Sequence, residues 1–279
     1  MSEDATELYL DLLKKCLTRY LWEETLRPYQ VPAWGGPLRR WLKRRMLAGM
    51  RARGIEPFER VPLERAAREM GRDWPVDAET MIGLRRLDNL QQCVTTIIRE
   101  KIPGDLVETG VWRGGASIFM RAVLAVYGDT TRKVWCADSF RGLPQPNLAD
   151  YPEDKAAWWH ESPELAVSIE TVKRNFARYG MLDEQVEFLE GWFKDTLPNA
   201  PIERCALIRL DGDMYESTLD ALNSLYAKLS PGGFLIIDDY GLPEDTCRRA
   251  IHDFRELYGI SEPIMDIDGY GAYWRRSSS

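Results

Sequence analysis

Histidine and long apolar runs are scarce in this chain of 279 residues, and its cysteines form no cluster. The two histidines are His160 and His252. The five cysteines are scattered: Cys16, Cys93, Cys136, Cys205 and Cys247. This spacing fits no zinc site and is typical of reduced thiols in a cytoplasmic protein. No apolar run reaches the roughly 20 residues that cross a bilayer, so we expect a cytoplasmic protein without a membrane partner.

Positive charge is also in deficit, because 44 acidic residues outnumber 37 lysines and arginines and leave a net charge of −7. This balance argues against a general nucleic-acid-binding protein. The hydrophobic content of 44% is ordinary for a globular chain, and a chain of this length can bury one sizeable core plus an appendage. We therefore expect one main domain with an appendage and no nucleic-acid partner.

The expected appendage is residues 1–80, and the main domain is residues 81–279. Segments with a helical pattern predict that the appendage is a helical cap: 8–22, 38–53 and 62–70. The stretch 38–53 is basic, and no acid occurs between Arg27 and Glu56. One interpretation is a surface for membrane or nucleic acid. The interpretation that we favour is a cap helix that packs on the core or on a second subunit of a homo-oligomer. Its residues Trp41, Leu42, Met46 and Leu47 would make this contact.

In the main domain, strand-like and helical segments alternate. The expected strands are 105–108, 133–137, 186–189, 206–210, 234–237, 263–267 and 272–275. The expected helices between them are 118–127, 164–179, 217–229 and 245–258. Strands separated by single helices predict a parallel sheet with right-handed crossovers, and the turn at Gly269 predicts a closing antiparallel hairpin at one edge. The predicted fold is α/β, a doubly wound, mostly parallel, Rossmann-like sheet of seven strands with an N-terminal helical cap.

A glycine-rich turn follows the first of these strands, with the order Glu108-Thr-Gly110 and then Gly114-Gly115. Glycine lets the backbone approach a ligand that a Cβ would block, and ligands bind at this end of such strands. The spacing is not the G-x-G-x-x-G of dinucleotide sites. The acid before the first glycine repels phosphate but suits the ammonium and sulfonium of S-adenosylmethionine. A plain structural turn is the alternative.

The next two strand ends carry residues suited to the rest of such a ligand. Asp138 ends the second strand, where an acid in nucleotide-binding folds accepts hydrogen bonds from the ribose hydroxyls. Trp192 and Phe193 follow the third strand, where an adenine ring would stack. The alternatives are a turn cap for Asp138 and core positions for the two aromatic residues.

Carboxylates follow the fourth and fifth strands. Asp211 and Asp213 follow the fourth strand, with Arg209 just before them, and Asp238-Asp239 follow the fifth strand. Neighbouring strands lie about 4.8 Å apart, so these side chains can converge on one ion. Oxygen-only ligands favour Mg²⁺, Mn²⁺ or Ca²⁺ over zinc. We expect Asp211, Asp238 and Asp239 to bind a metal, and Asp213 either joins them or caps the following turn. Surface aspartates in turns are the alternative.

The two histidines differ in setting. His252 lies within an expected helix and is interpreted as structural. His160 lies in the long insert 143–163, after Trp158-Trp159. Loops between strands and helices carry catalytic groups, and an imidazole titrates near neutral pH. A surface histidine without a function is the alternative.

Longer motifs run through the chain from Leu8 to its end. They are Thr80-Met-Ile-Gly-Leu-x-Arg-Leu-Asp-Asn-Leu90, Glu108-Thr-Gly-Val-Trp-Arg-Gly-Gly115, Asp138-Ser-Phe-x-Gly-Leu-Pro144, Asn175-Phe-x-x-Tyr-Gly180, Gly191-Trp-Phe-Lys-x-Thr-Leu197, Arg209-Leu-Asp-Gly-Asp-x-Tyr-Glu-Ser-Thr218, Gly232-Gly with Asp238-Asp-Tyr240, and Tyr273-Trp274. In this order they resemble the macrocin O-methyltransferase family of S-adenosylmethionine-dependent enzymes.

The resemblance implies a class I methyltransferase-like fold. It also implies Mg²⁺-dependent methyl transfer from S-adenosylmethionine to a hydroxyl, often on a deoxysugar of an antibiotic such as a macrolide. Asp211, Asp238 and Asp239 are then the metal ligands, and His160 is the general base, with Asp211 also in a catalytic role. The cofactor-binding residues that we expect are Thr80, Met81, Glu108, Thr109, Gly110, Val111, Trp112, Ser117, Asp138, Ser139, Gly191, Trp192, Phe193 and Asp211.

Other functions remain as alternatives. A metal-dependent phenol or catechol O-methyltransferase would use a similar acidic cluster. A catalytically silent α/β scaffold would need neither the cofactor nor the aspartates. A nicotinamide oxidoreductase is disfavoured by Glu108 and by the glycine spacing.

Overall fold

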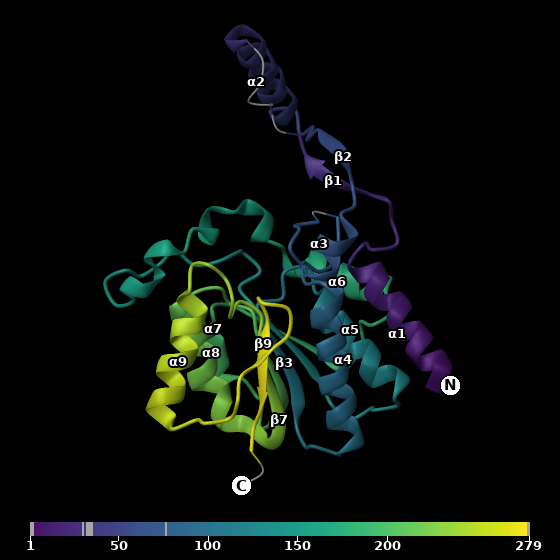
Figure 1. Ribbon diagram of the computed structural model, residues 1–279, viewed down its shortest axis with the longest axis vertical. Helices are drawn as coiled ribbons and strands as arrows, with labels where there is room; N and C mark the ends of the chain where they lie inside the picture. The colour runs from purple at the N-terminus through teal and green to yellow at the C-terminus, as the bar shows by residue number, and fades with distance from the viewer. Residues whose placement is uncertain (1–2, 30, 32–35, 76, 278–279) are drawn as a thin grey trace.

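A single central sheet organises the molecule (Figure 1). The structure is a computed structural model that describes residues 3–29, 31, 36–75 and 77–277. Within these residues the sheet has seven strands in the order β5-β4-β3-β6-β7-β9-β8. They are β3 (Asp105–Thr109), β4 (Val134–Asp138), β5 (Val186–Glu190), β6 (Cys205–Leu210), β7 (Leu229–Ile237), β8 (Met265–Asp266) and β9 (Ala272–Arg275). Strands β3 to β7 are parallel, whereas β9 is antiparallel to β7 and β8. The predicted mostly parallel sheet with an antiparallel hairpin at one edge is confirmed.

Helices cover both faces of this sheet. One group, on the right in Figure 1, is α1 (Glu3–Leu17), α4 (Leu84–Arg99), α5 (Gly115–Val126) and α6 (Ile169–Arg178). The other group is α7 (Phe193–Thr196), α8 (Tyr215–Leu225) and α9 (Thr246–Tyr258). Each face has its own buried cluster, with Phe119 and Phe176 in the first and Ile251 and Trp274 in the second. The fold is therefore doubly wound, as predicted. In the part of the chain that is described, no helix has the length and apolar character to span a bilayer.

Strand β3 is the point at which the strand order reverses. The chain passes from β3 to β4 on one side, and β6 later pairs with β3 on the other side. Ligands of open α/β sheets bind at the carboxyl ends of the strands at such a point. The register places Glu108 of β3 opposite Arg209 of β6, so the glycine-rich turn and the first acidic pair meet there.

The N-terminal region has two parts. Helix α1 packs on the body, where Leu10, Leu13 and Leu17 are buried in the first core. Strands β1 (Glu24–Pro28) and β2 (Phe58–Pro62) pair as a separate antiparallel sheet, with α2 (Pro37–Arg51) between them. Figure 1 shows α2 beyond this sheet, pointing away from the body. We call β1, α2 and β2 the arm. The prediction of a cap made only of helices was incomplete, because the pairing of β1 with β2 depends on contacts between distant segments.

Several predicted helix and strand ends shift. Helix α3 is limited to Arg65–Glu69, since β2 occupies the residues up to Pro62. Helix α6 begins at Ile169 and not at residue 164, because Ser168 caps it by accepting from the Thr171 N–H at 3.3 Å. Strand β7 begins earlier than predicted, with a register shift beside it. The 3-10 turns are η1 (Pro152–Ala156), η2 (Trp159–Glu161), η3 (Pro163–Leu165), η4 (Leu197–Asn199) and η5 (Tyr226–Lys228).

Candidate active site

Two adjoining cavities lie at the carboxyl ends of the parallel strands. The first is lined by residues that follow β3, β4, β5 and β6, among them Gly110, Asp138, Trp192 and Asp211. The second lies over the ends of β6 and β7 and is lined by Asp238 and by parts of the N-terminal region and the insert. The residues common to both linings are Met81, Trp112, Leu165, Asp211 and Asp213.

Most of the predicted cofactor-binding residues line one of these cavities. The first cavity has Met81, Gly110, Trp112, Asp138, Ser139, Gly191, Trp192, Phe193 and Asp211. The second adds Thr80, Glu108 and Val111. Thr109 and Ser117 line neither cavity and are buried. Ser117 instead donates its hydroxyl proton to Glu108. It therefore holds a residue that lines the second cavity and does not line a cavity itself.

The glycine at position 110 is required by packing. Its φ is 90°, and a Cβ at this position would lie 1.6 Å from the carbonyl oxygen of Asp211. The Asp211 N–H donates to the Thr109 carbonyl at 2.8 Å, which holds the two strand ends together. The close approach that the sequence suggested therefore exists, but its partner is the backbone after β6.

Glu108 is a buried acid between a guanidinium and a hydroxyl. Arg209 Nη1 lies 2.6 Å from Glu108 Oε1, and Ser117 donates to Oε2. Burial raises the pKa of Glu108 to about 7, although Arg209 and Ser117 act to lower it. Glu108 also lines the second cavity, where its carboxylate already pairs with Arg209, and the cationic ligand that we predicted beside it stays a prediction.

Asp138 ties the end of β4 to the glycine-rich turn. Its Oδ2 accepts from the N–H groups of Val111 at 2.6 Å and Trp112 at 3.3 Å, and Oδ1 accepts from Phe140 N–H at 2.7 Å. Burial raises the pKa of Asp138 despite these hydrogen bonds. The capping role that was the alternative for Asp138 is thus present, and the same residue lines the first cavity.

Three aspartates converge beside both cavities. Ligand atoms of Asp211, Asp238 and Asp239 all lie within 4.8 Å of one another. Burial and the neighbouring acids raise the pKa of Asp211 to about 6 and also raise that of Asp239. Burial acts to raise the pKa of Asp238 too, but Arg209 and Arg86 outweigh it and lower this pKa. Crowded carboxylate oxygens without sulfur or nitrogen donors fit a hard divalent cation such as Mg²⁺.

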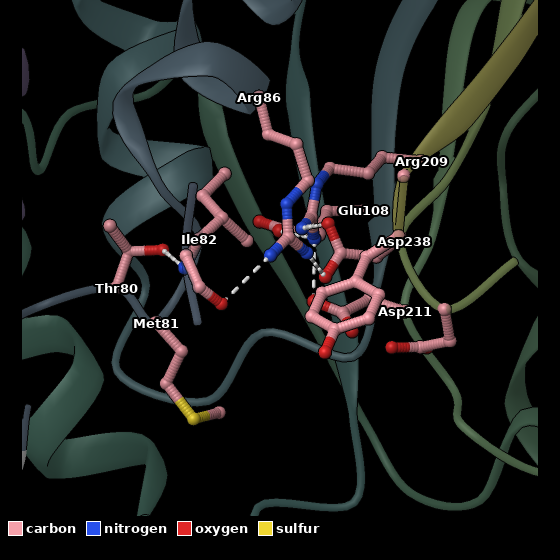
Figure 2. Close-up of polar contacts among 12 residues, drawn as sticks. Thr80, Met81, Ile82, Arg86, Glu108, Arg209, Asp211 and Asp238 are labelled. Carbon is pink, nitrogen blue, oxygen red and sulfur yellow. Dashed lines mark hydrogen bonds and ion pairs between the residues drawn. The ribbon is translucent and has the colours of Figure 1, made fainter. Parts of the chain in front are cut away.

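Two buried arginines oppose this negative charge. Figure 2 shows the guanidinium groups of Arg86 and Arg209 beside Asp238. Arg209 also donates to Asp211 Oδ2 at 2.7 Å. Arg86 comes from the start of α4, and the sequence analysis gave it no role. Arg86 lies in a helix and not at an expected strand end, so only its place in the motif 80–90 could have pointed to it.

Asp213 is a second residue whose place the sequence left open. Its φ is 56°, and its N–H donates to Asp239 Oδ2 at 3.1 Å. Asp213 lines both cavities, and burial raises the pKa of its carboxyl to about 8. The helix that follows has Met214 at its N-cap, so Asp213 is not the cap residue.

The two histidines lie away from this centre. His160 is in η2, where its Nδ1 lies 3.1 Å from the Ala157 carbonyl oxygen, and it lines neither cavity. Its neighbour Trp159 does line the second cavity. His252 lies on α9, where its Nε2 is 2.9 Å from the hydroxyl of Tyr240, in keeping with a structural role.

Aromatic residues form the outer wall of the second cavity. Trp159 stacks on Trp158 with ring centroids 3.9 Å apart and meets Trp74 edge-on at 6.1 Å. The Arg72 guanidinium lies 5.5 Å from the centre of the Tyr270 ring. Trp74 and Arg72 come from the loop after α3, which the sequence analysis did not connect with the site. Such a wall suits a ligand with both apolar and hydroxyl-bearing surfaces.

Known proteins resemble the chain over almost its whole length. The model of the family described as macrocin-O-methyltransferase matches residues 6–276. An 8-demethyl-8-(2,3-dimethoxy-alpha-L-rhamnosyl)-tetracenomycin-C 4'-O-methyltransferase of Streptomyces olivaceus is 52% identical over 280 aligned positions, which cover 100% of this chain and 96% of the relative. A mycinamicin III 3''-O-methyltransferase of Micromonospora griseorubida is 46% identical, with coverage of 98% and 97%.

A solved structure agrees with this assignment. The O-methyltransferase NovP superposes with a TM-score of 0.82 at 42% identity, covering 98% of this chain and 99% of that one. The resemblance stated from the motifs is confirmed by both kinds of comparison. The chain belongs to the macrocin-O-methyltransferase family and is an O-methyltransferase.

Proposed function

We propose that the protein transfers the methyl group of S-adenosylmethionine to a hydroxyl of a deoxysugar on a glycosylated natural product, with Mg²⁺, in antibiotic biosynthesis. The observation that carries this proposal is the aspartate trio in the second cavity, because its member Asp211 also lines the adjoining first cavity. Two relatives named for methylation at primed positions of a rhamnosyl tetracenomycin and of mycinamicin III support a sugar as the acceptor.

The two cavities divide the substrates between them in this proposal. The first would hold the cofactor, with Trp192 and Phe193 beside the adenine and Asp138 beside the ribose. The second, with its aromatic wall, would hold the acceptor sugar. Their common border at Met81 and Asp211 is then where the methyl group passes from sulfur to oxygen by in-line displacement. This placement holds the reacting atoms close together, which lowers the barrier.

The metal ligands in this proposal are Asp211, Asp238 and Asp239. When bound, Mg²⁺ would supply Lewis-acid activation by lowering the pKa of the sugar hydroxyl. The three carboxylates, which line the second cavity, would hold the ion there, and the aromatic wall would exclude water from the acceptor.

The general base has two candidates. His160 is the residue that the resemblance implies, although its ring faces the Ala157 carbonyl in this structure. Asp213 is favoured by its position, because it lines both cavities. Either group would take the hydroxyl proton as the oxygen attacks the methyl.

The function is tested by mass spectrometry on purified protein with S-adenosylmethionine and Mg²⁺. The acceptor panel should contain glycosylated macrolides and polyketides, their aglycones, and a simple catechol. We expect the mass gain of one CH₂ group on the glycosides only, and its loss when EDTA removes the metal. Methylation of the aglycone or catechol would instead favour the phenol-type enzyme. No product, together with no heat of cofactor binding in calorimetry, would favour a silent scaffold.

We also propose that the arm joins copies of the chain into a homo-oligomer. Leu38, Trp41, Leu42 and Met46 of α2 are 52–69% exposed, which is unusual for apolar residues on one helix. Residues 28–55 carry seven positive and no negative side chains, so the net charge of −7 leaves −14 for the rest of the chain. A second copy of this chain is therefore complementary to the arm in charge. All five cysteines are unpaired, which supports a cytoplasmic location.

A further inference from the structure

Arg86 connects three segments that are far apart in sequence. Its Nη1 donates to Asp238 Oδ2, its Nε lies 3.0 Å from Asp268 Oδ2, and its Nη2 lies 3.4 Å from the Gly71 carbonyl oxygen. The side chain is only 8% exposed. It therefore joins the loop after α3, the end of β7 and the loop before β9.

The backbone around Arg86 leaves room for it in two places. A Cβ at Gly71 would lie 2.5 Å from Arg86 Nη2. A Cβ at Gly271 would lie 2.8 Å from Arg86 Cδ. Side chains at these positions would collide with the arginine. The lack of a side chain at both glycines therefore leaves space for Arg86.

Asp268, the partner of Arg86 in the loop before β9, is itself held by backbone hydrogen bonds. Asp268 Oδ1 accepts from Tyr270 N–H at 3.1 Å and from Gly271 N–H at 2.8 Å, while Oδ2 accepts from Arg86. The Asp268 side chain is 0% exposed. The guanidinium is thus anchored to a closed turn, and its free edge is directed at Asp238 (Figure 2).

Both oxygens of Asp238 are held by guanidinium groups. Arg209 donates to Oδ1 and Arg86 to Oδ2. Arg209 is shared among three acids, Glu108, Asp211 and Asp238, so it does not fix Asp238 alone. Arg86 makes no ion pair with the other two members of the trio among the described contacts. Each carboxylate oxygen keeps a second lone pair for a metal.

We infer that Arg86 is a positioning residue that orients Asp238 for the divalent cation, and that Asp268 acts through it. This inference rests on the proposed metal site. Hydrogen-bond partners of metal ligands orient them, and their removal typically weakens metal binding roughly 10–100-fold. The opposite expectation would hold if Arg86 only competed with the cation, because its removal would then tighten binding.

The test measures Mn²⁺ binding to the full chain by calorimetry and by electron paramagnetic resonance. We expect Arg86→Met and Asp268→Asn to weaken binding roughly 10–100-fold and to broaden the Mn²⁺ spectrum. Arg86→Lys should weaken it as well, since one ammonium cannot reach Asp238 and Asp268 together. Asp268→Asn keeps an oxygen for the N–H groups of Tyr270 and Gly271, so the turn should survive.

The matched control is Arg121→Met. Arg121 is equally buried and pairs with Asp183 at 2.6 Å, but it lies on α5 and lines neither cavity. We expect this variant to lose stability and to keep wild-type Mn²⁺ affinity. Melting curves for all variants separate loss of folding from loss of binding. If Arg86→Met does not fold, Asp268→Asn and Arg86→Lys decide the outcome.

The outcomes are distinguishable. Wild-type or tighter Mn²⁺ affinity in folded Arg86 and Asp268 variants overturns the inference and leaves the proposed function standing. No Mn²⁺ binding by the wild type contradicts the metal site of the proposed function, and the inference falls with it.

Discussion

Glu108, Asp211 and Asp238 share one buried arginine, Arg209, whose side chain is 2% exposed. Removing one partner of a buried ion pair typically costs about 3–5 kcal/mol, because a charge is left without compensation. Replacing the whole set by apolar residues is often neutral or stabilising. These charges are therefore weak evidence for a role in stability. Their position in the second cavity, with Asp211 also lining the first, is better explained by the chemistry of the site.

The first prediction concerns the general base. If His160 takes the proton, His160→Ala should lower turnover about 10²–10⁴-fold and leave cofactor affinity unchanged. If Asp213 does so, Asp213→Asn should have this effect and His160→Ala should not. Turnover from single-turnover kinetics, with cofactor affinity from calorimetry, distinguishes the two. Normal turnover in both variants would contradict both assignments.

The second prediction concerns pH. Without metal, the pKa of Asp211 is raised to about 6 by burial and by the neighbouring Asp238. The metal requires the ionised carboxylate, so protons compete with it as pH falls through this value, and affinity is restored above it. We expect Mn²⁺ affinity to rise with pH and to fall by roughly tenfold per pH unit below about pH 6, and the raised pKa of Asp239 extends the loss of affinity to higher pH. Calorimetry across this range checks it, and an affinity independent of pH would contradict it.

At the scale of elements, the turn between β3 and α5 has to satisfy two neighbours at once. Gly110 packs against the backbone of Asp211, and Gly114, with φ 90°, precedes α5. The carboxylate of Asp138 then accepts from the N–H groups of Val111 and Trp112 between them. This one turn joins the carboxyl ends of β3, β4 and β6. The backbone on that side of the first cavity is therefore held in place.

The third prediction follows from this packing. Gly110→Ala should unfold the domain or abolish cofactor binding, because its Cβ would lie 1.6 Å from a backbone oxygen. The control is Gly128→Ala, where φ is also positive at 71° but nothing lies within 4 Å of a Cβ. That variant should lose only about 1 kcal/mol and bind the cofactor normally. Urea unfolding and calorimetry measure both, and equal losses in the two variants would refute the packing argument.

At the scale of the whole molecule, the arm is the part that the body does not cover. Leu47 is buried on α2 and Met50 is half-buried, whereas Leu38, Trp41, Leu42 and Met46 are exposed. An isolated helix with such an apolar face gains most of its stability from packing against a partner.

The fourth prediction tests this assembly. Light scattering should give the wild type a mass that is a multiple of the 32.2 kDa chain. The double variant Trp41→Glu and Met46→Glu should be a monomer, because two charges would be buried at the contact. As a control, Leu257→Glu alters an apolar residue that is 75% exposed on α9, outside the arm, and should keep the wild-type mass. A monomeric wild type would overturn the proposed oligomer.

Much of the fold was determined by local sequence. Alternating apolar strands and helices, with glycine at the turn after Glu108, predicted the parallel sheet and its helices, because periodicity and backbone conformation are properties of short segments. The same logic placed Asp211, Asp238 and Asp239 at neighbouring strand ends, where the structure brings them together. The β1–β2 pairing had no such local signal.

Only the tertiary structure decided which groups face one another across the site. Arg86 meets Asp238 and Asp268 from positions 152 and 182 residues away, and Trp74 meets Trp159 at the cavity wall. In the tertiary structure, His160 lines neither cavity, whereas Asp213 lines both. Such pairings form when helices, strands and loops pack together. They depend on contacts between residues that are far apart in sequence, so no short segment predicts them. Local sequence therefore determined the scaffold and its strand-end acids, and packing decided their partners.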